Sequence, residues 1–370
     1  MPNPPHPLAP PRDRWSRTRL VLAGLLVAAA LVVLVSYALR RRAAPPRVAP
    51  VSLSIQRTAQ GFVLSRSVRG RMLFRLQAGL ATQYKDRDRV ALHDVQLDLF
   101  DPDGRHVDQI YGGAFDYEPR TGLVRAQSLV HIDLEGELPA GALNAPAAPP
   151  EEVHNPVHVA ARNLTFNAKS GSGDVTGGLD FKYLDASGGA DRAHLETETD
   201  QITLSGHVHL SWTRPGQPPL EITAGSALLD RPLSRIILSE QPRLVSGSRR
   251  LRAGEIVLQL RPDYSVRAAR ATGGVEARER EAGRAFAARA DQALLELRPR
   301  PGRGRRRRAD PLSQANLAAT ALQMTGRVRI SAQTAREDEQ MQAGSVVIRF
   351  GPENAPAAAT ASGGARLTLR

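Results

Sequence analysis

Several segments of the chain alternate apolar and polar residues, and this period of two decides the fold class. In the clearest copy, Ile202, Leu204, Val208 and Leu210 fall on one side of the alternation, with Gly206 among them. The intervening side chains are hydroxyls and imidazoles. Such alternation is typical of a β-strand with one buried face. The sequence therefore predicts a mainly β protein.

The same pattern recurs along the chain. A Gly-x-Val core lies in residues 202–212, again in 322–330, and in degenerate form in 269–277. A second unit containing Ala-Gly or Gly-Gly recurs between these copies, as in ITAGSALLD, LRAGEIVLQL, MQAGSVVIRF and IYGGAFDYEP. Glycine inside a strand marks a bulge, a bend or a close backbone approach. Repeated short strands predict a stacked antiparallel sheet.

Two stretches also fit a helical spacing. Phe286, Ala290 and Leu294 recur at intervals of four, and residues 317–324 show a similar spacing. Because both stretches lie between the repeats, we expect strands there.

The N-terminal region contains 20 uncharged residues, 20–39, with the sequence LVLAGLLVAAALVVLVSYAL. A helix of this length is roughly 30 Å long, which matches the hydrocarbon core of a bilayer. The run is longer than a signal-peptide core and is followed at once by three arginines, 40–42, so an uncleaved transmembrane helix is predicted. Four arginines flank each end, and the positive-inside rule therefore gives no orientation.

Orientation is predicted from the content of the two sides. Residues 1–19 are a short, Pro-rich segment, expected to be a cytoplasmic tail, whereas the long remainder is β-rich. These features indicate a single-pass inner-membrane protein with the bulk of the chain in the periplasm.

Low-complexity segments divide the remaining chain. We expect a stiff spacer at 43–50, a first β domain at 51–137, a linker at 138–150 and a second β domain at 151–350. Residues 351–370 are predicted to be a tail or a last strand.

Composition excludes several classes. The chain has no cysteine among its 370 residues, which rules out disulfide scaffolds and thiolate metal sites. The net charge of +13 invites a nucleic-acid interpretation. However, eight arginines flank the apolar segment and five more lie in one run at 303–308, so the rest of the chain is close to neutral. That run fits a solvated loop or a contact with anionic lipid. Because the bulk of the chain is expected in the periplasm, no nucleic-acid partner is predicted.

The first β domain resembles the LptC family of lipopolysaccharide export. The resemblance lies in YKDRDRVALHDVQLDLFDPDGRHVDQIYGGAFDYEPRTGLVRAQSLVHIDL, residues 84–134, which follows the apolar segment. It contains an apolar hairpin, a D-G-R turn, an I-x-G-x-x-x-x-Y-like strand and a closing G-x-x-x-A-x-x-x-V-x-I pattern. The later Gly-x-Val and Ala-Gly units resemble the OstA/LptA-type periplasmic module of the same system.

This resemblance implies an open, V-shaped β-jellyroll whose strands line a continuous apolar groove for the acyl chains of lipopolysaccharide. The implied partners are an inner-membrane ABC exporter, whose subunits the helix would contact, and a periplasmic bridge protein joined by edge-strand addition. LptC proteins carry one such domain, whereas this chain is predicted to carry a second, fused module.

Alternation identifies the apolar side chains that would face a groove. Each could equally be ordinary sandwich core, and both interpretations stay open. In the first domain the candidates are Leu92, Val95, Leu97, Leu99, Val130 and Ile132. In the second they are Ile202, Leu204, Val208, Leu210, Ile256, Leu258, Val328 and Ile330.

The sequence gives little support for metal binding or catalysis. His207 and His209 are spaced to share one strand face, but no third ligand is placed nearby, so solvated histidines are expected rather than a metal site. Asp94 and Asp98 alternate onto an outward face, where we expect them to be solvated. No nucleophile elbow, phosphate-binding loop or HExxH motif is present, so no catalytic residue, metal or cofactor is predicted.

The sequence therefore predicts a non-enzymatic protein that receives lipopolysaccharide from an ABC exporter and passes it to a periplasmic bridge. The alternative is a membrane-anchored envelope scaffold or signalling regulator with a repetitive β domain.

Overall fold

The structure is a computed structural model and describes residues 55–84, 88–100, 106–126, 128–137, 157–183, 185–214, 217–262, 265–281, 283–299, 317–334, 337–351 and 354–369. The predicted tail, transmembrane segment, spacer, linker and arginine run at 303–308 lie outside these residues. Among the residues described, no helix is long and apolar enough to cross a membrane.

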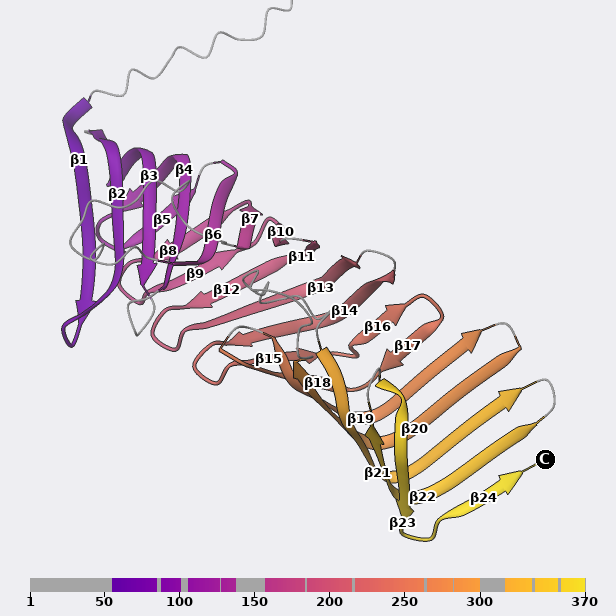
Figure 1. Cartoon of the computed structure of the whole chain (residues 1–370). Helices are drawn as coiled ribbons and strands as arrows, with labels where there is room; N and C mark the ends of the chain where they lie inside the picture. The colour runs from indigo at the N-terminus through magenta and orange to yellow at the C-terminus, as the bar shows by residue number, and fades with distance from the viewer. Residues whose placement is uncertain are drawn as a thin grey trace, which may run out of the picture. The chain divides into compact units, whose positions relative to one another are not determined.

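The described chain consists of antiparallel β-strands that join into one hydrogen-bonded ladder of 24 strands (Figure 1). The mainly β prediction is confirmed. In chain order the strands are β1 (Ile55–Val68), β2 (Arg71–Tyr84), β3 (Val90–Phe100), β4 (His106–Glu118), β5 (Leu123–Ala126), β6 (Val130–Glu137), β7 (Val157–Ala161), β8 (Leu164–Asn167), β9 (Ser172–Val175), β10 (Leu179–Tyr183), β11 (Ala186–Ala190), β12 (Arg192–Glu196), β13 (Gln201–Arg214), β14 (Gln217–Asp230), β15 (Arg235–Ser239), β16 (Arg243–Ser246), β17 (Arg249–Arg252), β18 (Glu255–Leu260), β19 (Val266–Glu281), β20 (Arg284–Pro299), β21 (Leu317–Thr334), β22 (Asp338–Phe350), β23 (Pro356–Ser362) and β24 (Arg366–Leu369).

The two stretches with helical spacing are strands, β20 and β21, as expected from their position between the repeats. Each lies between two long partners, and the ladder hydrogen bonds on both sides decide the conformation. The segment 351–370 contains β23 and β24, so its described part ends in strands rather than in a tail.

Long strands belong to two half-sheets at once. The first part of β4 pairs with β6, whereas its last part pairs with β5. In the same way β13 pairs with both β11 and β12, and β14 with both β15 and β16. The two pairing routes run side by side from β4 to the last described strands, whereas β1, β2 and β3 pair along their length in one sheet. We call the two routes half-sheet A, which contains β6, β7, β10, β11, β16, β17 and β24, and half-sheet B, which contains β5, β8, β9, β12, β15, β18 and β23.

The half-sheets meet along a seam, defined as the positions where long strands shift register and short strands end. From β13 onward the seam repeats one motif. Two consecutive residues with positive φ stand opposite one residue of the next strand, as at Gly206-His207, Gly273-Gly274 and Gly326-Arg327. This is the two-against-one geometry of a β-bulge. The Gly-x-Val repeat in the sequence is this bulge.

The residues opposite two of these bulges explain the Ala-Gly repeat. Gly225 and Gly344 stand opposite Gly206-His207 and Gly326-Arg327. A Cβ atom added to Gly344 would lie 3.2 Å from the carbonyl oxygen of Gly363, which is closer than a side chain allows comfortably. Gly344 is therefore required because the backbone of Gly363 approaches it, and Gly225 because an added Cβ atom would collide with the side chain of Glu240.

The predicted boundary between two β domains does not interrupt the ladder. Strand β6 pairs with β7 through Val130 and Ala161, and β5 pairs with β8 through Val124 and Phe166. The strands before and after the linker at 138–150 thus share both half-sheets.

Candidate functional site

An apolar row runs across half-sheet A on the face directed toward half-sheet B. Each member is the direct cross-strand partner of the next, so the row crosses every strand of the half-sheet. In spatial order row A consists of Leu64, Leu76, Leu97, Ile110, Ile132, Val159, Phe181, Gly188, Leu210, Ile222, Leu244, Leu251, Ala277, Ala288, Ile330, Met341 and Leu367.

Half-sheet B carries a matching row. Row B consists of Tyr117, Val124, Phe166, Gly173, Leu195, Ile202, Leu229, Ile236, Leu258, Ala269, Leu295, Leu322, Ile348 and Ala359. The two rows face each other. Ala288 and Val328 of half-sheet A share one packed cluster with Met324 and Val346 of half-sheet B.

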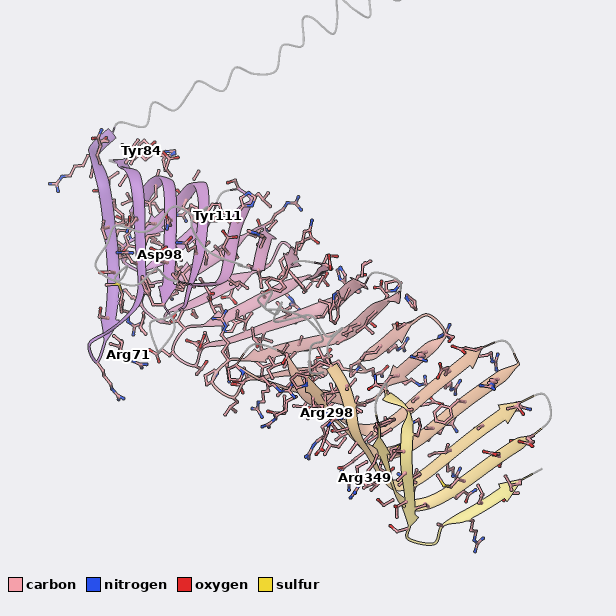
Figure 2. All side chains as sticks on the ribbon, viewed as in Figure 1. Arg71, Tyr84, Asp98, Tyr111, Arg298 and Arg349 are labelled. Atoms are coloured by element: carbon pink, nitrogen blue, oxygen red, sulfur yellow. The ribbon has the colours of Figure 1, made fainter. Side chains whose placement is uncertain are left out.

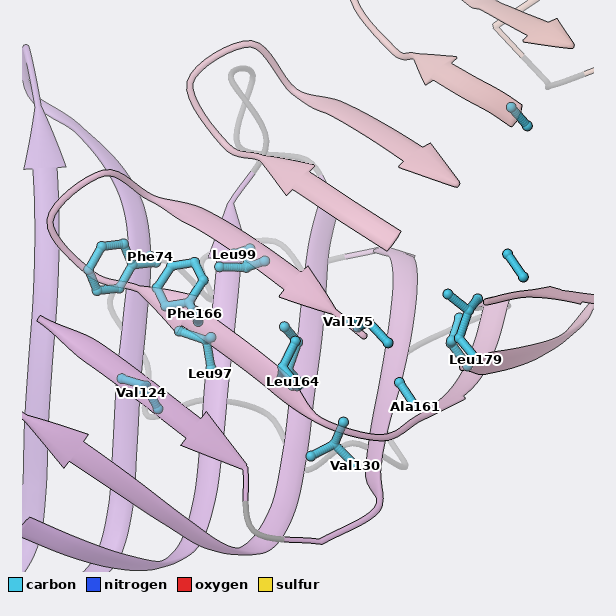
Figure 3. Packing of buried hydrophobic residues seen from close by; sticks show 14 of the residues in the cluster. Phe74, Leu97, Leu99, Val124, Val130, Ala161, Leu164, Phe166, Val175 and Leu179 are labelled. Atoms are coloured by element: carbon cyan, nitrogen blue, oxygen red, sulfur yellow. The ribbon is translucent and has the colours of Figure 1, made fainter. Parts of the chain in front are cut away.

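The N-terminal part of the space between the half-sheets is a closed core. Phe74 from β2 packs edge-on against Phe166 from β8, with ring centroids 5.2 Å apart (Figure 3). Leu76 and Leu97 of row A and Val124 of row B are all buried here. Side chains beyond the rows, such as Leu99, are buried as well, so the two half-sheets remain packed together away from the seam.

From β13 onward the burial changes. The residues next to the seam stay buried, as Val208, Ile256 and Val328 show. One step further from the seam, the large aliphatic side chains of both rows are only half-buried. We call this strip the trough; it consists of Leu210, Ile222, Leu244, Leu251, Ile330 and Met341 from row A, and of Ile202, Leu229, Ile236, Leu258, Leu295, Leu322 and Ile348 from row B. This gradient of burial is expected where two walls diverge from a common line.

Polar contacts mark the boundary between the closed core and the trough. Arg231, which follows β14, donates to Asp108 of β4 at 2.9 Å and to Asp200 at 3.0 Å, and thus joins the two half-sheets. The Arg231 and Asp108 side chains are 11% and 6% exposed. Because both side chains are shielded from water, loss of one partner would leave an uncompensated charge between the half-sheets.

The structure places every predicted groove residue on the inward faces, but in two different environments. Leu92, Val95, Leu97, Leu99 and Val130 lie in the closed core, and Ile132 is half-buried at its side. Val208, Ile256 and Val328 form the floor of the trough, and Leu204 lies beside them, half-buried. Ile202, Leu210, Leu258 and Ile330 lie in its walls. Lipid contact by these residues stays a prediction.

Sequence reasoning missed nine of the thirteen trough residues. Leu244, Leu251 and Ile236 lie on short strands, where four or five residues are too few to reveal an alternation. Leu322 and Ile348 lie in the repeats themselves, and the equivalent positions were available from the Gly-x-Val and Ala-Gly spacing.

The outward face of the closed core contradicts one expectation. Asp98 lies on the outward face of β3, as predicted, but its side chain is 1% exposed rather than solvated (Figure 2). It accepts hydrogen bonds from Gln96 at 2.9 Å and from Arg75 and Gln109 at 3.4 Å. Burial raises the pKa of the Asp98 carboxyl, although Gln96, Arg75 and Gln109 act in the opposite direction.

The side chains that follow the bulge glycines contact carboxylates at the seam. His207 Nδ1 lies 2.7 Å from Asp191 Oδ2, and the left-handed backbone at His207 turns its side chain toward that carboxylate. Arg327 occupies the equivalent position in the later repeat and donates to Asp291 at 2.8 Å. Among the described residues no group of three or more potential ligands could hold a metal ion.

Comparison with known proteins gives one result of note. No protein-family model matches the chain, and no curated protein matches it. Among solved structures, the chain is similar to the crystal structure of LptH from Pseudomonas aeruginosa, described as the LptA-homologous periplasmic component of a lipopolysaccharide transport device. The match has 11% identity and a TM-score of 0.28, and it covers 41% of this chain and 94% of LptH.

Proposed function

We propose that the chain transports lipopolysaccharide across the periplasm by holding its acyl chains in the trough. The observation that carries this proposal is the pair of facing apolar rows, which pass from strand to strand along the ladder and become half-buried from β13 onward. A buried core needs no partner, whereas a long strip of half-buried aliphatic side chains gains free energy when an apolar ligand covers it.

The trough suits acyl chains in particular. Each methylene group transferred from water to an apolar environment contributes about 0.8 kcal/mol, so several acyl chains supply enough free energy for firm binding. Aliphatic side chains present no polar atoms that would fix one position. The same contacts therefore recur along the rows, and a bound lipid can move from one strand to the next.

The remaining parts of the proposal concern anchoring and partners. Residues 20–39 would anchor the chain in the inner membrane and contact subunits of an ABC exporter, which would supply the energy. Strands β1 and β24 end the ladder within the described residues, and a periplasmic bridge protein would add its own strand there. In this scheme the chain is not an enzyme and needs no cofactor.

A pair of neighbouring residues provides the sharpest test. A photo-crosslinking amino acid at Leu322 points into the trough, whereas one at Gln323 lies on the opposite face of the same strand. In cells we expect capture of lipopolysaccharide at position 322 and none at 323. Leu97 is 1% exposed in the closed core, so a crosslinker there is expected to capture nothing, in contrast to what the alternation alone suggests.

Absence of capture at Leu322 and at Leu251, with the variants folded and present in the membrane, would exclude the proposal. The alternative, a signalling regulator, makes a different prediction. It requires a cytoplasmic partner for residues 1–19, so their deletion would abolish function while lipopolysaccharide export stayed normal.

A further inference from the structure

The outward face of half-sheet A carries a concavity that the proposed transport does not use. It has a volume of about 800 Å³ and spans β17, β19, β20, β21 and β22. Most of its lining residues alternate with row A and therefore lie on the face directed away from the trough, whereas Ile330 and Met341 of row A also contribute to the lining. The charges of this face can be examined independently of any lipid in the trough.

The concavity exists because small side chains stand between long ones. Ala287 pairs with Ser331 across β20 and β21, and Ala285 pairs with Gln333 beside them. Arginines surround this floor of small residues. They are Arg250, Arg278, Arg280, Arg289 and Arg329.

The register places like charges directly opposite each other. Arg250 is the cross-strand partner of Arg278, and Arg289 is the partner of Arg329. Like charges at directly opposed positions destabilise a sheet. Two such pairs on one face therefore represent a cost that an anionic ligand would relieve.

One buried carboxylate organises part of the cluster. Glu276 accepts hydrogen bonds from Arg252 at 2.6 Å, from Arg278 at 2.9 Å and from Arg289 at 2.8 Å. The Arg278 and Arg289 side chains nevertheless remain 56% and 60% exposed. Glu276 thus holds these guanidinium groups in place while leaving them accessible to a ligand.

The other three arginines have no acidic partner within the described part of the chain. These are Arg250, Arg280 and Arg329. Glu279 and Asp338 are the acidic residues at the lining, and Glu279 forms an ion pair with Arg249 at 2.7 Å. The concavity therefore keeps a net positive charge.

We propose that this concavity binds a saccharide that carries two or more phosphate groups. Guanidinium groups recognise phosphate through paired hydrogen bonds, and two cross-strand arginine pairs, Arg250–Arg278 and Arg289–Arg329, line the concavity. Ser331, Gln340 and Gln342 add neutral donors and acceptors suited to sugar hydroxyls. A hollow with these groups on its walls favours a discrete ligand over a flat membrane surface.

Binding of fructose 1,6-bisphosphate to the full chain in a non-ionic detergent tests the proposal by calorimetry. We expect a dissociation constant below 1 mM, on the order of the values common for small ligands. The double variant R250Q/R329Q should weaken binding at least tenfold. The matched control Arg349→Gln, an exposed arginine on the outward face of half-sheet B, should change binding by less than twofold.

Further controls separate the concavity from other sources of anion binding. Replacing the five arginines of the run at 303–308 by glutamine should leave the affinity unchanged. Thermal unfolding of R250Q/R329Q should stay cooperative, with a midpoint no lower than that of the wild type, which shows that the variant is folded. Inorganic phosphate and unphosphorylated fructose should each bind at least tenfold more weakly than the bisphosphate.

The proposal is overturned if the wild type does not bind the bisphosphate or if inorganic phosphate binds equally well. It is also overturned if binding disappears with the 303–308 arginines instead of with Arg250 and Arg329. Binding confined to detergent micelles that contain phosphatidylglycerol would also overturn it, because that result indicates contact with a membrane surface.

Discussion

Glu276 links the stability of the C-terminal strands to pH. Burial opposes its ionisation, but hydrogen bonds from Arg289, Arg278 and Arg252 outweigh this and lower the pKa of Glu276 to about 2 from its ordinary 4.5. Since the folded-state pKa is the lower one, the ionised carboxylate stabilises the fold above pH 4.5, and this contribution is lost as the pH falls toward 2.

The variant Glu276→Gln should therefore unfold more easily than the wild type at pH 6, and the difference should shrink as the pH falls from 4.5 toward 2. Denaturant unfolding at several pH values measures it. Glu279→Gln is the matched control, because Glu279 pairs with one exposed arginine, Arg249, whose side chain is 72% exposed. A difference for Glu276→Gln that did not vary with pH would contradict the ionic role of this carboxylate.

Substitution of one of the opposed arginines, in contrast, should increase the stability of the fold. Replacing Arg329 by glutamine removes a like-charge contact with Arg289 and should raise the free energy of unfolding by roughly 0.2–1 kcal/mol at low salt. The gain should diminish as salt screens the repulsion. Urea unfolding at two salt concentrations measures it, with Arg349→Gln as the control for a lone arginine. A loss of stability for Arg329→Gln would show that its partners are attractive.

At the scale of single strands, the seam bulges make glycine necessary. Gly326 has a φ of 74°, and an added Cβ atom would collide with the carboxylate of Asp291. Gly283, in the turn between β19 and β20, has a nearly equal φ of 75°, but no described atom lies within 4 Å of such a Cβ. A comparison of the two positions therefore separates the cost of the left-handed backbone from the cost of the collision with Asp291.

Gly283→Ala should cost about 1–2 kcal/mol, the penalty of a left-handed backbone, whereas Gly326→Ala should cost clearly more, because Asp291 must also move. Urea unfolding of both variants compares them. Equal losses would mean that the side chain of Asp291 yields without cost and that only φ matters at the seam.

The mainly β antiparallel fold could be predicted from the sequence, for identifiable reasons. The Gly-x-Val repeat marks the bulges because their first residue combines a positive φ with a close approach of Asp191 or Asp291, and the alternation around Val208 and Val328 places the right side chains inward. The division into a closed core and a trough could not be predicted. It depends on Phe74 meeting Phe166 and on Arg231 meeting Asp108, which are contacts between residues about a hundred positions apart. Alternation carries no information on such contacts.

At the scale of the whole ladder, the last described strand leaves apolar groups uncovered. Leu367 ends row A and is 65% exposed, and Leu369 beside it is 66% exposed. All members of row A on strands β2 to β22 have a cross-strand neighbour on both sides. A strand added next to β24 would give Leu367 its second neighbour and continue the row.

Since the chain lacks cysteine, a single Leu369→Cys variant allows specific crosslinking at this edge. In cells we expect a crosslinked product with a strand-adding partner, and Leu367→Lys in the same background should lower its yield severalfold, because the added charge would be buried at the junction. Arg349→Cys, on the outward face, is the control. An unchanged yield with Leu367→Lys would place the partner elsewhere.

The recurrence of the seam motif also bears on how chains of this kind could change in length. Each hairpin of long strands, such as β13–β14 and β21–β22, crosses the seam once in each direction and restores the inward face. Duplication or loss of such a hairpin would therefore leave all other rungs in register, whereas an odd number of strands would reverse the direction of the chain. We expect natural variants of the chain to differ in length by even numbers of strands and to keep the same kind of strand at each end of the ladder.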